Sequence, residues 1–498
     1  MDEQTLSFYG VVIVGAGPVG LFLACELGLR GLSVLVLERE VSPLSPLKRK
    51  PFGVRGLTIP TIEALYRREL LSAIGAVVPR EAGHFAGVGF DYRDVDTSKW
   101  SYRLPSPADT NSAGEMQCIE SALAVRARAV GVEIVRGVEV RSFGQSADAV
   151  TVETSDGLFR AQWLVGCDGG RSIVRKVGGF EFVGTEPDLT GYSTLVEIAD
   201  PEKLRAERSV TPTGVYFLPQ PGFLAMAEFD GGSFHRTEPI TLEHVQSVLR
   251  RVSNTDVTLT ALHAVTSWTD RAQQATTYKK GRVLLAGDAA HIHSPLGGQG
   301  LNLGLGDAMN LGWKLAATLR GEAPAGLLDT YTTERHPIGA AVLDWSRAQV
   351  SIMKPSAQSR ALEAIISDLM HTRDGATYFA ERVWNASLRY DLGENHPLAG
   401  RSVPDFELTD GTRLAALLRR GSGVLLDFDL RAPLRAVAGR MGITYLASSA
   451  KDTLGLSAVL VRPDGVVAWA ADGEPDANEA SRAAGRWFAS TQCPNSFA

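Results

Sequence analysis

Cysteine is scarce in this chain of 498 residues. The only four are Cys25, Cys118, Cys167 and Cys493, and no two of them form a Cys-x-x-Cys pair. A dithiol redox centre or a structural zinc site would need such pairs or a cluster of ligands. Their spacing argues against both kinds of site and indicates reduced, intracellular cysteines.

Long runs of like charge are also missing. The chain has 50 basic and 56 acidic residues, a formal net charge of -6, and no run of one sign longer than Lys48–Lys50. Nucleic acid is therefore not an expected partner. The first residues, Met-Asp-Glu, are acidic where an export signal would be positive. We predict a cytoplasmic protein.

One apolar stretch, residues 11–29, is almost long enough to span a bilayer. It contains four glycines and a proline in a strand–turn–helix arrangement, so no membrane association is expected. The length of the chain predicts two to four domains.

The N-terminal segment predicts a βαβ unit. A run of β-branched residues ends in glycine at position 15, residues 18–30 have apolar residues at helical spacing, and residues 33–39 form a second buried strand. Between the strands lies Gly15-x-Gly17-x-x-Gly20, and Glu38 ends the second strand. A lone GxGxxG often marks only a tight turn. Together with the two strands, the helix and the acidic residue at the expected spacing, the motif predicts a dinucleotide-binding site. FAD or NAD fits this site better than NADP, because Glu38 would repel a phosphate on the ribose.

Two further strands end in aspartate. Residues 163–166 lead into Cys-Asp168-Gly169-Gly, and residues 282–286 lead into Gly287-Asp288 and a helix from Gly300 to about Leu319. Doubly wound folds bind ligands at such strand ends. For Asp168 the alternative is an Asx turn that caps the next helix.

His291 and His293 form a His-x-His pair in the second of these segments. Such a pair can bind a metal, but no third histidine or cysteine stands nearby, so we predict structural histidines and no metal. Trp313 and Lys314 are expected to pack on their helix, the lysine with its amine reaching solvent.

The middle and the end of the chain differ from this pattern. Residues 180–276 contain β-like runs and one amphipathic helix, which predicts an inserted sheet domain. From about residue 396 a further α/β domain begins, with a hairpin turn at Pro463-Asp464-Gly465.

These motifs together resemble the single-component FAD-dependent aromatic hydroxylases of the para-hydroxybenzoate hydroxylase type, most of all their polyketide-tailoring branch. The resemblance implies an α/β fold with a Rossmann-like FAD-binding domain, an inserted β-sheet substrate domain and a C-terminal thioredoxin-like domain without a Cys-x-x-Cys pair. The implied division is FAD-binding domain at 1–75, 111–179 and 277–394, substrate domain at 76–110 and 180–276, and thioredoxin-like domain at 395–498.

The resemblance also assigns roles to residues. The glycine loop with Pro18 and Val19 would hold the FAD pyrophosphate, and Glu38 with Arg39 the ribose. The rest of the implied cofactor site comprises Gln117, Asp168, Gly169, Asp288, Pro295, Gly298, Gln299, Gly300, Leu301 and Asn302. Pro295, Gly297 and Gly298 would form the surroundings of the flavin ring, and no acid or base is assigned.

The resemblance also implies that substrate contacts come from the inserted sheet, one face of which would cover the flavin. The bulky candidates are Tyr216, Phe217, Met226 and Phe229. Neighbouring strand residues point to opposite faces, so about half of such a set would fill the core instead.

One segment departs from the family pattern. Relatives carry Ser-Arg-Gly and then Thr-x-Arg-Thr after the second strand, whereas here Val54-Arg55-Gly56 is followed by Thr58-Ile59-Pro60-Thr61. Because Pro60 stands where an arginine is common, Arg55 is the candidate FAD contact in this loop and Arg49 the alternative.

The implied function is a monooxygenase that uses FAD, NADPH or NADH, and O2 to hydroxylate an aromatic or polyketide small molecule through a flavin hydroperoxide. The alternatives are Baeyer–Villiger or antibiotic-inactivating oxygenation on the same scaffold, a halogenase or dehydrogenase, and a flavin-binding protein that has lost catalysis. The sequence contains no second dinucleotide fingerprint, which a separate NAD(P)H domain would need. This agrees with the resemblance, because in that family the nicotinamide binds only transiently. A monomer or homodimer is expected.

Overall fold

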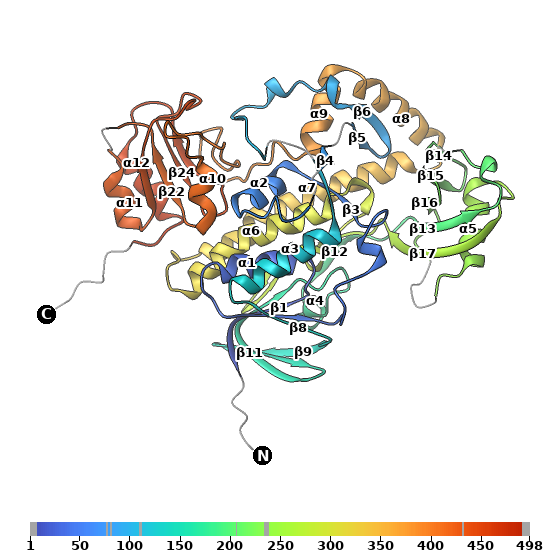
Figure 1. Cartoon of the computed structure of the whole chain (residues 1–498), viewed down its shortest axis with the longest axis horizontal. Coiled ribbons are helices and arrows are strands. Elements are labelled where there is room, and N and C mark those ends of the chain that lie inside the picture. Colours follow the sequence, from blue (N-terminus) through green and yellow to red (C-terminus); the bar gives the residue numbers. More distant parts are fainter. Residues whose placement is uncertain are drawn as a thin grey trace, which may run out of the picture.

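The structure is a computed structural model that describes residues 7–75, 78–79, 82–108, 112–205, 207–233, 239–430 and 433–490. Helix α6 (Gly300–Leu319) runs through its middle (Figure 1). A C-terminal α/β unit and a sheet covered by helix α5 (Leu242–Ser253) lie at opposite ends of the molecule, with a large parallel sheet beneath α6 (Figure 1).

The large sheet has a parallel centre, as the apolar strand sequences predict. Its central strands lie in the order β20 (Val283–Leu285), β11 (Gly157–Gly166), β1 (Phe8–Val14), β2 (Val34–Glu38) and β8 (Glu133–Arg136). Antiparallel strands β19 (Lys279–Lys280), β10 (Val150–Thr154) and β9 (Val140–Gln145) complete it. The predicted βαβ unit is confirmed, with helix α1 at Pro18–Gly28 between β1 and β2.

Helices cover the sheet on the side of α6. Their core is apolar and continuous with the buried strands. Besides α1 and α6 this layer contains α2 (Ile59–Arg67), α3 (Met116–Ala129) and α7 (Thr330–Met353). Helix α8 (Ala357–Met370) packs on α7 and α9 (Arg373–Val383) on α8, while the short α4 (Ile173–Val177) contacts β9 and β11.

Helix α2 is shorter than the sequence pattern predicts. The sequence predicts a helix over residues 61–74. In the structure α2 ends at Arg67, and Glu69 has a left-handed backbone with φ 57°. The reason is tertiary, since Arg68 donates hydrogen bonds to Glu26 of α1 and to the carbonyl oxygens of Leu418 and Pro463 in the C-terminal unit.

Three small sheets connect these parts. One holds β3 (Val54–Leu57), β7 (Ser112–Glu115) and β4 (Val78–Pro79); the second β5 (Ala82–Phe85) and β6 (Val88–Asp91); the third β12 (Phe182–Thr185), β18 (Ala272–Ala275) and β21 (His291–Ile292).

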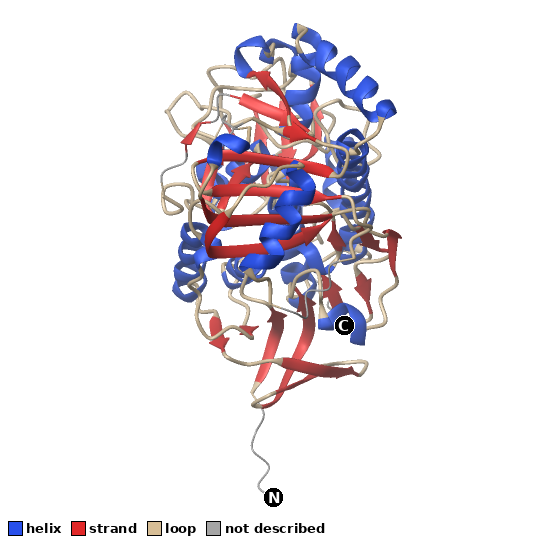
Figure 2. Cartoon of the chain, turned by 90° about the vertical axis from the view of Figure 1, so that its right-hand side faces the viewer, coloured by secondary structure: helices blue, strands red, loops and turns tan. Residues whose placement is uncertain are grey.

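The predicted inserted sheet is antiparallel and has five strands. They lie in the order β14 (Ser209–Val210), β15 (Gly214–Gln220), β16 (Phe223–Glu228), β13 (Thr190–Ile198) and β17 (Leu259–Thr269). Helix α5 lies across one face of this sheet (Figure 2). Alternate strand residues on that face form a separate apolar core with α5.

The C-terminal unit has a four-stranded mixed sheet flanked by helices. Its strands lie in the order β23 (Thr444–Ala447), β22 (Val424–Asp427), β24 (Ala458–Val461) and β25 (Val467–Ala471), and its helices are α10 (Leu414–Leu417), α11 (Arg435–Met441) and α12 (Ala477–Gly485). The predicted hairpin turn at residues 463–465 is confirmed. The Arg462 amide donates to the Val466 carbonyl, and Gly465 has φ 80°.

Buried charges join this hairpin to the helices. Arg462 is 0% exposed and donates to Glu334 of α7 at 2.9 and 2.8 Å, while Lys314 of α6 lies 2.9 Å from the same carboxylate. The expectation that Lys314 reaches solvent was therefore wrong, because its amine is fully buried against Glu334 and Asn310. Burial, partly offset by Glu334, lowers the pKa of Lys314 to about 7. Trp313 packs, as expected, with its ring 5.3 Å from Arg462.

Among the described residues no helix combines the length and the apolar character that a bilayer span requires.

Candidate active site

The motifs found in the sequence meet at one edge of the large sheet. Val14, Gly166 and Leu285 end adjacent parallel strands in direct register, and Val14 is also paired with Leu37. The glycine loop, Asp168, Asp288 and Glu38 follow those positions, so segments far apart in the chain lie side by side.

The three glycines of the loop have different surroundings. A Cβ at Gly15, which has φ 105°, would lie 2.4 Å from the Cys167 carbonyl oxygen, and one at Gly20 would lie 2.1 Å from the Gly15 carbonyl oxygen. A Cβ at Gly17 would meet no atom within 4 Å. Gly15 and Gly20 are therefore required by the fold, whereas Gly17 borders open space at the start of α1.

The start of α1 has no side-chain cap, and its Pro18 donates no hydrogen bond. Helix N-termini leave several amides unpaired and favour anions. Glu38 accepts hydrogen bonds from the amides of Ala16, at 2.7 Å, and Glu40, so its carboxylate anchors the loop. Arg39 is exposed and pairs with Glu40. Val19 packs its side chain toward Gly287 and Gly304, which leaves only its backbone for a ligand.

Asp168 caps the next helix with one carboxylate oxygen and, within the part of the chain that the structure describes, leaves the other oxygen unused. Its Oδ2 accepts hydrogen bonds from the amides of Ile173 and Val174, which is the predicted cap of the following helix. Its Oδ1 is buried and has no hydrogen-bond partner among the described residues. Burial raises the pKa of Asp168. Beside it a Cβ at Gly169, with φ 77°, would meet no atom within 4 Å.

A second uncapped helix start lies at α6. Gln299 is its N-cap residue and forms no side-chain cap, and a Cβ at Gly298, with φ 63°, would meet nothing within 4 Å. Asp288 is exposed, and its Oδ1 lies 3.8 Å from the position of a Cβ on Gly300. Leu301, one residue into α6, packs against the main core.

His293 points toward the same helix start. Its Nε2 is buried without a partner among the described residues and lies 3.5 Å from the Cβ position of Gly300. Burial lowers the pKa of His293, which favours its neutral form. The sequence predicts only a structural role for this histidine, because the residues around it do not indicate which way its ring points.

His291 belongs to a buried network beneath the site. Its Nε2 lies 2.7 Å from Asp307, and that carboxylate also accepts hydrogen bonds from Arg335 and from the Gly287 amide. Burial alone would raise the pKa of Asp307, but His291 and Arg335 hold it below its usual value. Within the described ranges no three His, Cys, Asp or Glu side chains are grouped to hold a metal ion.

The loop that departs from the family pattern is tied to α6. Asn302 accepts a hydrogen bond from the Thr58 amide at 2.9 Å and donates to the carbonyl oxygens of Gly56 and Gly298. Arg55 folds back on the carbonyl oxygens of Phe52 and Val54. Arg49, the alternative, is exposed. Gln117, next to this loop at the start of α3, has a buried Oε1 without a partner among the described residues.

An apolar cavity of about 360 Å³ lies between the inserted sheet and the turn at Pro295–Gly297. Leu296 of that turn is one wall, and Phe217 of β15 and Trp268 of β17 are others. Pro295 is exposed beside it, and a Cβ at Gly297 would lie 2.8 Å from the amide nitrogen of the Gln349 side chain, so this turn packs closely against α7.

The four bulky substrate candidates divide between the two faces of the sheet. Phe217 lines the cavity and is 41% exposed, and Phe229 packs in the same apolar cluster as Leu296. Tyr216 and Met226 are paired with each other across β15 and β16 and belong to the core beneath α5. Both are also among the residues that line the cavity, and their role as substrate contacts stays a prediction.

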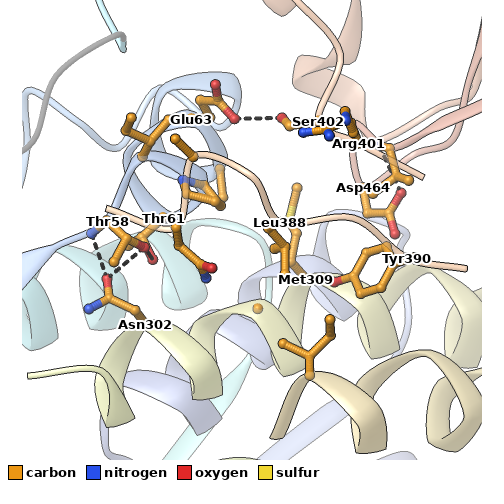
Figure 3. Close-up of a pocket in the computed structure, with 18 of the residues that line it drawn as sticks. Thr58, Thr61, Glu63, Asn302, Met309, Leu388, Tyr390, Arg401, Ser402 and Asp464 are labelled. Carbon is orange, nitrogen blue, oxygen red and sulfur yellow. Dashed lines mark hydrogen bonds between the residues drawn. The ribbon is translucent and has the colours of Figure 1, made fainter. Parts of the chain in front are cut away.

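A smaller cavity, with several polar residues in its wall, lies along α6 and next to α2 (Figure 3). It is enclosed by α2, α6 and the C-terminal unit, and its volume is about 80 Å³. Thr58 with Asn302, and Glu63 with Ser402, are hydrogen-bonded along its wall (Figure 3). Pockets for small molecules usually hold about 300–1,000 Å³. Of these two cavities, only the apolar one is large enough for an aromatic substrate.

The edge of the sheet therefore fits a dinucleotide with a ring system at one end. It offers open space at Gly17, Gly169 and Gly298 and two uncapped helix starts. Buried acceptor atoms of Gln117 and Asp168, which have no partner in the described chain, suit hydroxyl groups between them.

Comparison with known proteins agrees with this geometry. The family model of the FAD binding domain matches residues 9–346, and that of the aromatic-ring hydroxylase C-terminal domain matches residues 396–491. The chain belongs to the FAD-dependent aromatic-ring hydroxylases. It is a FAD-dependent monooxygenase, as the sequence motifs predicted.

Relatives in this hydroxylase family cover nearly the whole chain. A monooxygenase from Claviceps purpurea is 44% identical over 96% of this chain and 97% of its own length. Rifampicin monooxygenase from Streptomyces venezuelae is 38% identical over 94% of this chain and 97% of its own. The structure of anhydrotetracycline hydroxylase from Streptomyces rimosus is 35% identical, with a TM-score of 0.84 and coverage of 97% of this chain and 99% of that one.

Proposed function

We propose that this hydroxylase uses NADPH or NADH and O2 to hydroxylate a polycyclic phenol or a related polyketide. The observation that carries the proposal is the position of the apolar cavity. One of its walls, Leu296, belongs to the turn between the Asp288 strand end and the start of α6. A flat substrate in this cavity would lie beside the space that we assign to the flavin ring.

The individual residue roles are part of the same proposal. Gly15, Gly17 and Gly20 would place the FAD pyrophosphate at the start of α1, with Asp168, Gly169 and Asp288 along the chain of hydroxyl groups. The amides of residues 300–302, at the positive end of the α6 dipole, would favour the negative charge of the reduced ring. Pro295, Gly297 and Gly298 would border that ring, and Arg55 and Gln117 would approach it from the β3 side. Phe217 and Phe229 would contact the substrate.

FAD, when bound, supplies the redox chemistry, taking electrons from the nicotinamide and delivering one atom of O2 to the substrate. The protein has to bind and orient the two molecules and exclude water. The apolar walls of the cavity suit that task, and no protein nucleophile is needed.

We also propose the division into domains given by the sequence. One apolar core confined to the inserted sheet with α5 and another confined to the C-terminal unit support it. If the C-terminal unit is thioredoxin-like, its role is structural, because its sequence contains no Cys-x-x-Cys pair for thiol exchange. A cytoplasmic monomer or homodimer remains our prediction.

The test is to purify the protein, measure its flavin absorbance, and follow NADPH and NADH oxidation with O2 uptake across a panel of phenolic polyketides. We expect substrate-stimulated oxidation and a product heavier by one oxygen atom. The product's mass and rearrangement separate hydroxylation from Baeyer–Villiger insertion. Conversion of substrate without NAD(P)H or O2, or a protein that cannot be reconstituted with FAD, would contradict the proposal.

A further inference from the structure

One cationic side chain lines the otherwise largely apolar cavity. Arg208 stands just before β14, and its side chain passes over Gly87 in the β5–β6 hairpin, where a Cβ would lie 2.5 Å from its Cδ. Of the other residues in this lining, only His84 can carry a positive charge. An arginine in such surroundings needs an anionic partner, because an unpaired buried charge is costly.

The charges around Arg208 do not balance. Its Nη1 lies 2.5 Å from Oε1 of Glu363 on α8, and Oε2 of the same carboxylate pairs with Arg360. Two guanidinium groups therefore share one carboxylate, which leaves one positive charge. Helix α8 packs against β6 beside this cluster, and Figure 1 shows α8, β6 and β14 at one end of the molecule.

The guanidinium group of Arg208 also has an unused hydrogen-bond donor. Nη2 of Arg208 is buried and has no hydrogen-bond partner in the part of the chain that is described. Only the Nη1 atom is used by Glu363. Burial lowers the pKa of Arg208, so an added anion would relieve the cost of keeping it charged. A guanidinium group that keeps one free edge matches an anionic oxygen well.

We propose that Arg208 binds an ionised oxygen of the substrate, a phenolate or the enolate of a β-diketone, and selects substrates that carry one. This rests on the proposed function and extends it. Ionisation makes an aromatic ring richer in electrons, which favours attack on an electrophilic oxygen. The arginine would thus stabilise the reactive form of the substrate in a site where no catalytic base has been assigned.

Substitution of Glu363 distinguishes an anion-binding role of Arg208 from a purely structural one. If the Arg208–Glu363 pair only supports the fold, Arg208→Gln and Glu363→Gln should have the same effect. If Arg208 binds an anion, they should act in opposite directions, because Glu363→Gln removes the competing negative charge. Arg251→Gln is the matched control, since Arg251 pairs with Glu228 and lies on α5, across the sheet from the cavity.

The probes are 2-hydroxyanthraquinone, whose phenolate absorbs at longer wavelength, and 2-methoxyanthraquinone, which cannot ionise. Binding of each to the FAD-loaded protein is titrated by absorbance over a range of pH, and thermal unfolding checks each variant. We expect Arg208→Gln to weaken binding of the hydroxy compound about tenfold and to raise the pKa of the bound phenol. The methoxy compound and the Arg251→Gln variant should show little change.

Glu363→Gln should strengthen binding of the hydroxy compound and lower the pKa of the bound phenol. If Arg208→Gln does not fold, this variant alone decides. Equal binding of the two probes, no binding of either, or weaker phenolate binding in both variants would overturn the proposal. FAD content and NADPH oxidation are measured in the same samples. NADPH oxidation without a preference for the phenolate would support the proposed function and contradict the role of Arg208. Phenolate binding without NADPH oxidation would support the role of Arg208 and contradict the proposed function.

Discussion

At the scale of single residues, the candidate site consists of a few side chains and glycines that parallel strand pairing brings to one edge of the large sheet. Gly15, Gly17 and Asp168 follow strand ends, so local motifs predict them. The sequence could not predict the positions of the His293 ring or of Arg208, because the features that single them out depend on distant contacts. Arg208 meets Glu363 across 155 positions of sequence. Strand alternation likewise predicts two faces for Tyr216 and Phe217 but not which face the cavity occupies.

Gly17→Ala tests the site at this scale. Because a Cβ at Gly17 meets no protein atom, the variant should keep its stability within about 0.5 kcal/mol. It should bind FAD at least tenfold more weakly, since the methyl group occupies the space proposed for the pyrophosphate. The control is Gly20→Ala, whose Cβ would overlap the Gly15 carbonyl and destabilise the fold itself. Flavin titration and urea unfolding of both variants are the measurements. Unchanged FAD affinity in Gly17→Ala would remove this glycine from the cofactor site.

At the scale of elements, helices and strands with a strong apolar period are predicted best. Helix α6 begins at Gly300 and ends at Leu319, as expected, and α1 ends within two residues of its predicted limit. The prediction fails at α2, where Arg67 and Arg68 bind the C-terminal unit. No local pattern records a contact more than 300 residues away.

Close packing of α1 on α6 gives the prediction for this scale. A Cβ at Gly312 would lie 2.5 Å from the Cβ of Glu26, a buried residue held by Arg68. Alanine favours a helix over glycine by about 1 kcal/mol, but overpacking costs about 1–3 kcal/mol. We therefore expect Gly312→Ala to be neutral or destabilising by up to about 2 kcal/mol in urea unfolding. In the control Gly439→Ala, in α11, the new Cβ has open space, and stability should rise. Stabilisation of both variants alike would mean that the helices separate readily.

At the scale of the whole molecule, the sequence predicts the C-terminal unit but not its attachment. Lys314 and Arg462 are ordinary surface residue types, yet both are buried against Glu334. Burial alone would raise the pKa of Glu334, but Arg462 and Lys314 lower it to about 2. The contact is thus electrostatic at its centre, and losing one partner leaves a buried charge.

Arg462→Met should therefore destabilise the protein by about 3–5 kcal/mol, the usual cost of breaking a buried ion pair. The matched surface change is Arg486→Ala, which removes a partly exposed pair with Glu394 and should cost less than about 1 kcal/mol. Urea unfolding followed by tryptophan fluorescence compares the two. Similar midpoints for both variants would show that the buried pair contributes little to attachment.

Acid should loosen the same contact before it unfolds the large sheet. The pKa of Glu334 is lowered from 4.5 to about 2 in the folded protein, so its stabilising contribution is complete above pH 4.5 and is lost as the pH falls toward 2. Lys314 acts in the same direction at higher pH, because its lowered pKa makes the unfolded chain bind more protons between about pH 7 and 10.5. Hydrogen exchange at stepwise lower pH should therefore show residues 458–471 losing protection before residues 157–166. These two segments report on the C-terminal sheet and on β11 at the centre of the large sheet. Loss of protection in both at the same pH would mean that the ion pairs at Glu334 do not control the attachment of the C-terminal unit.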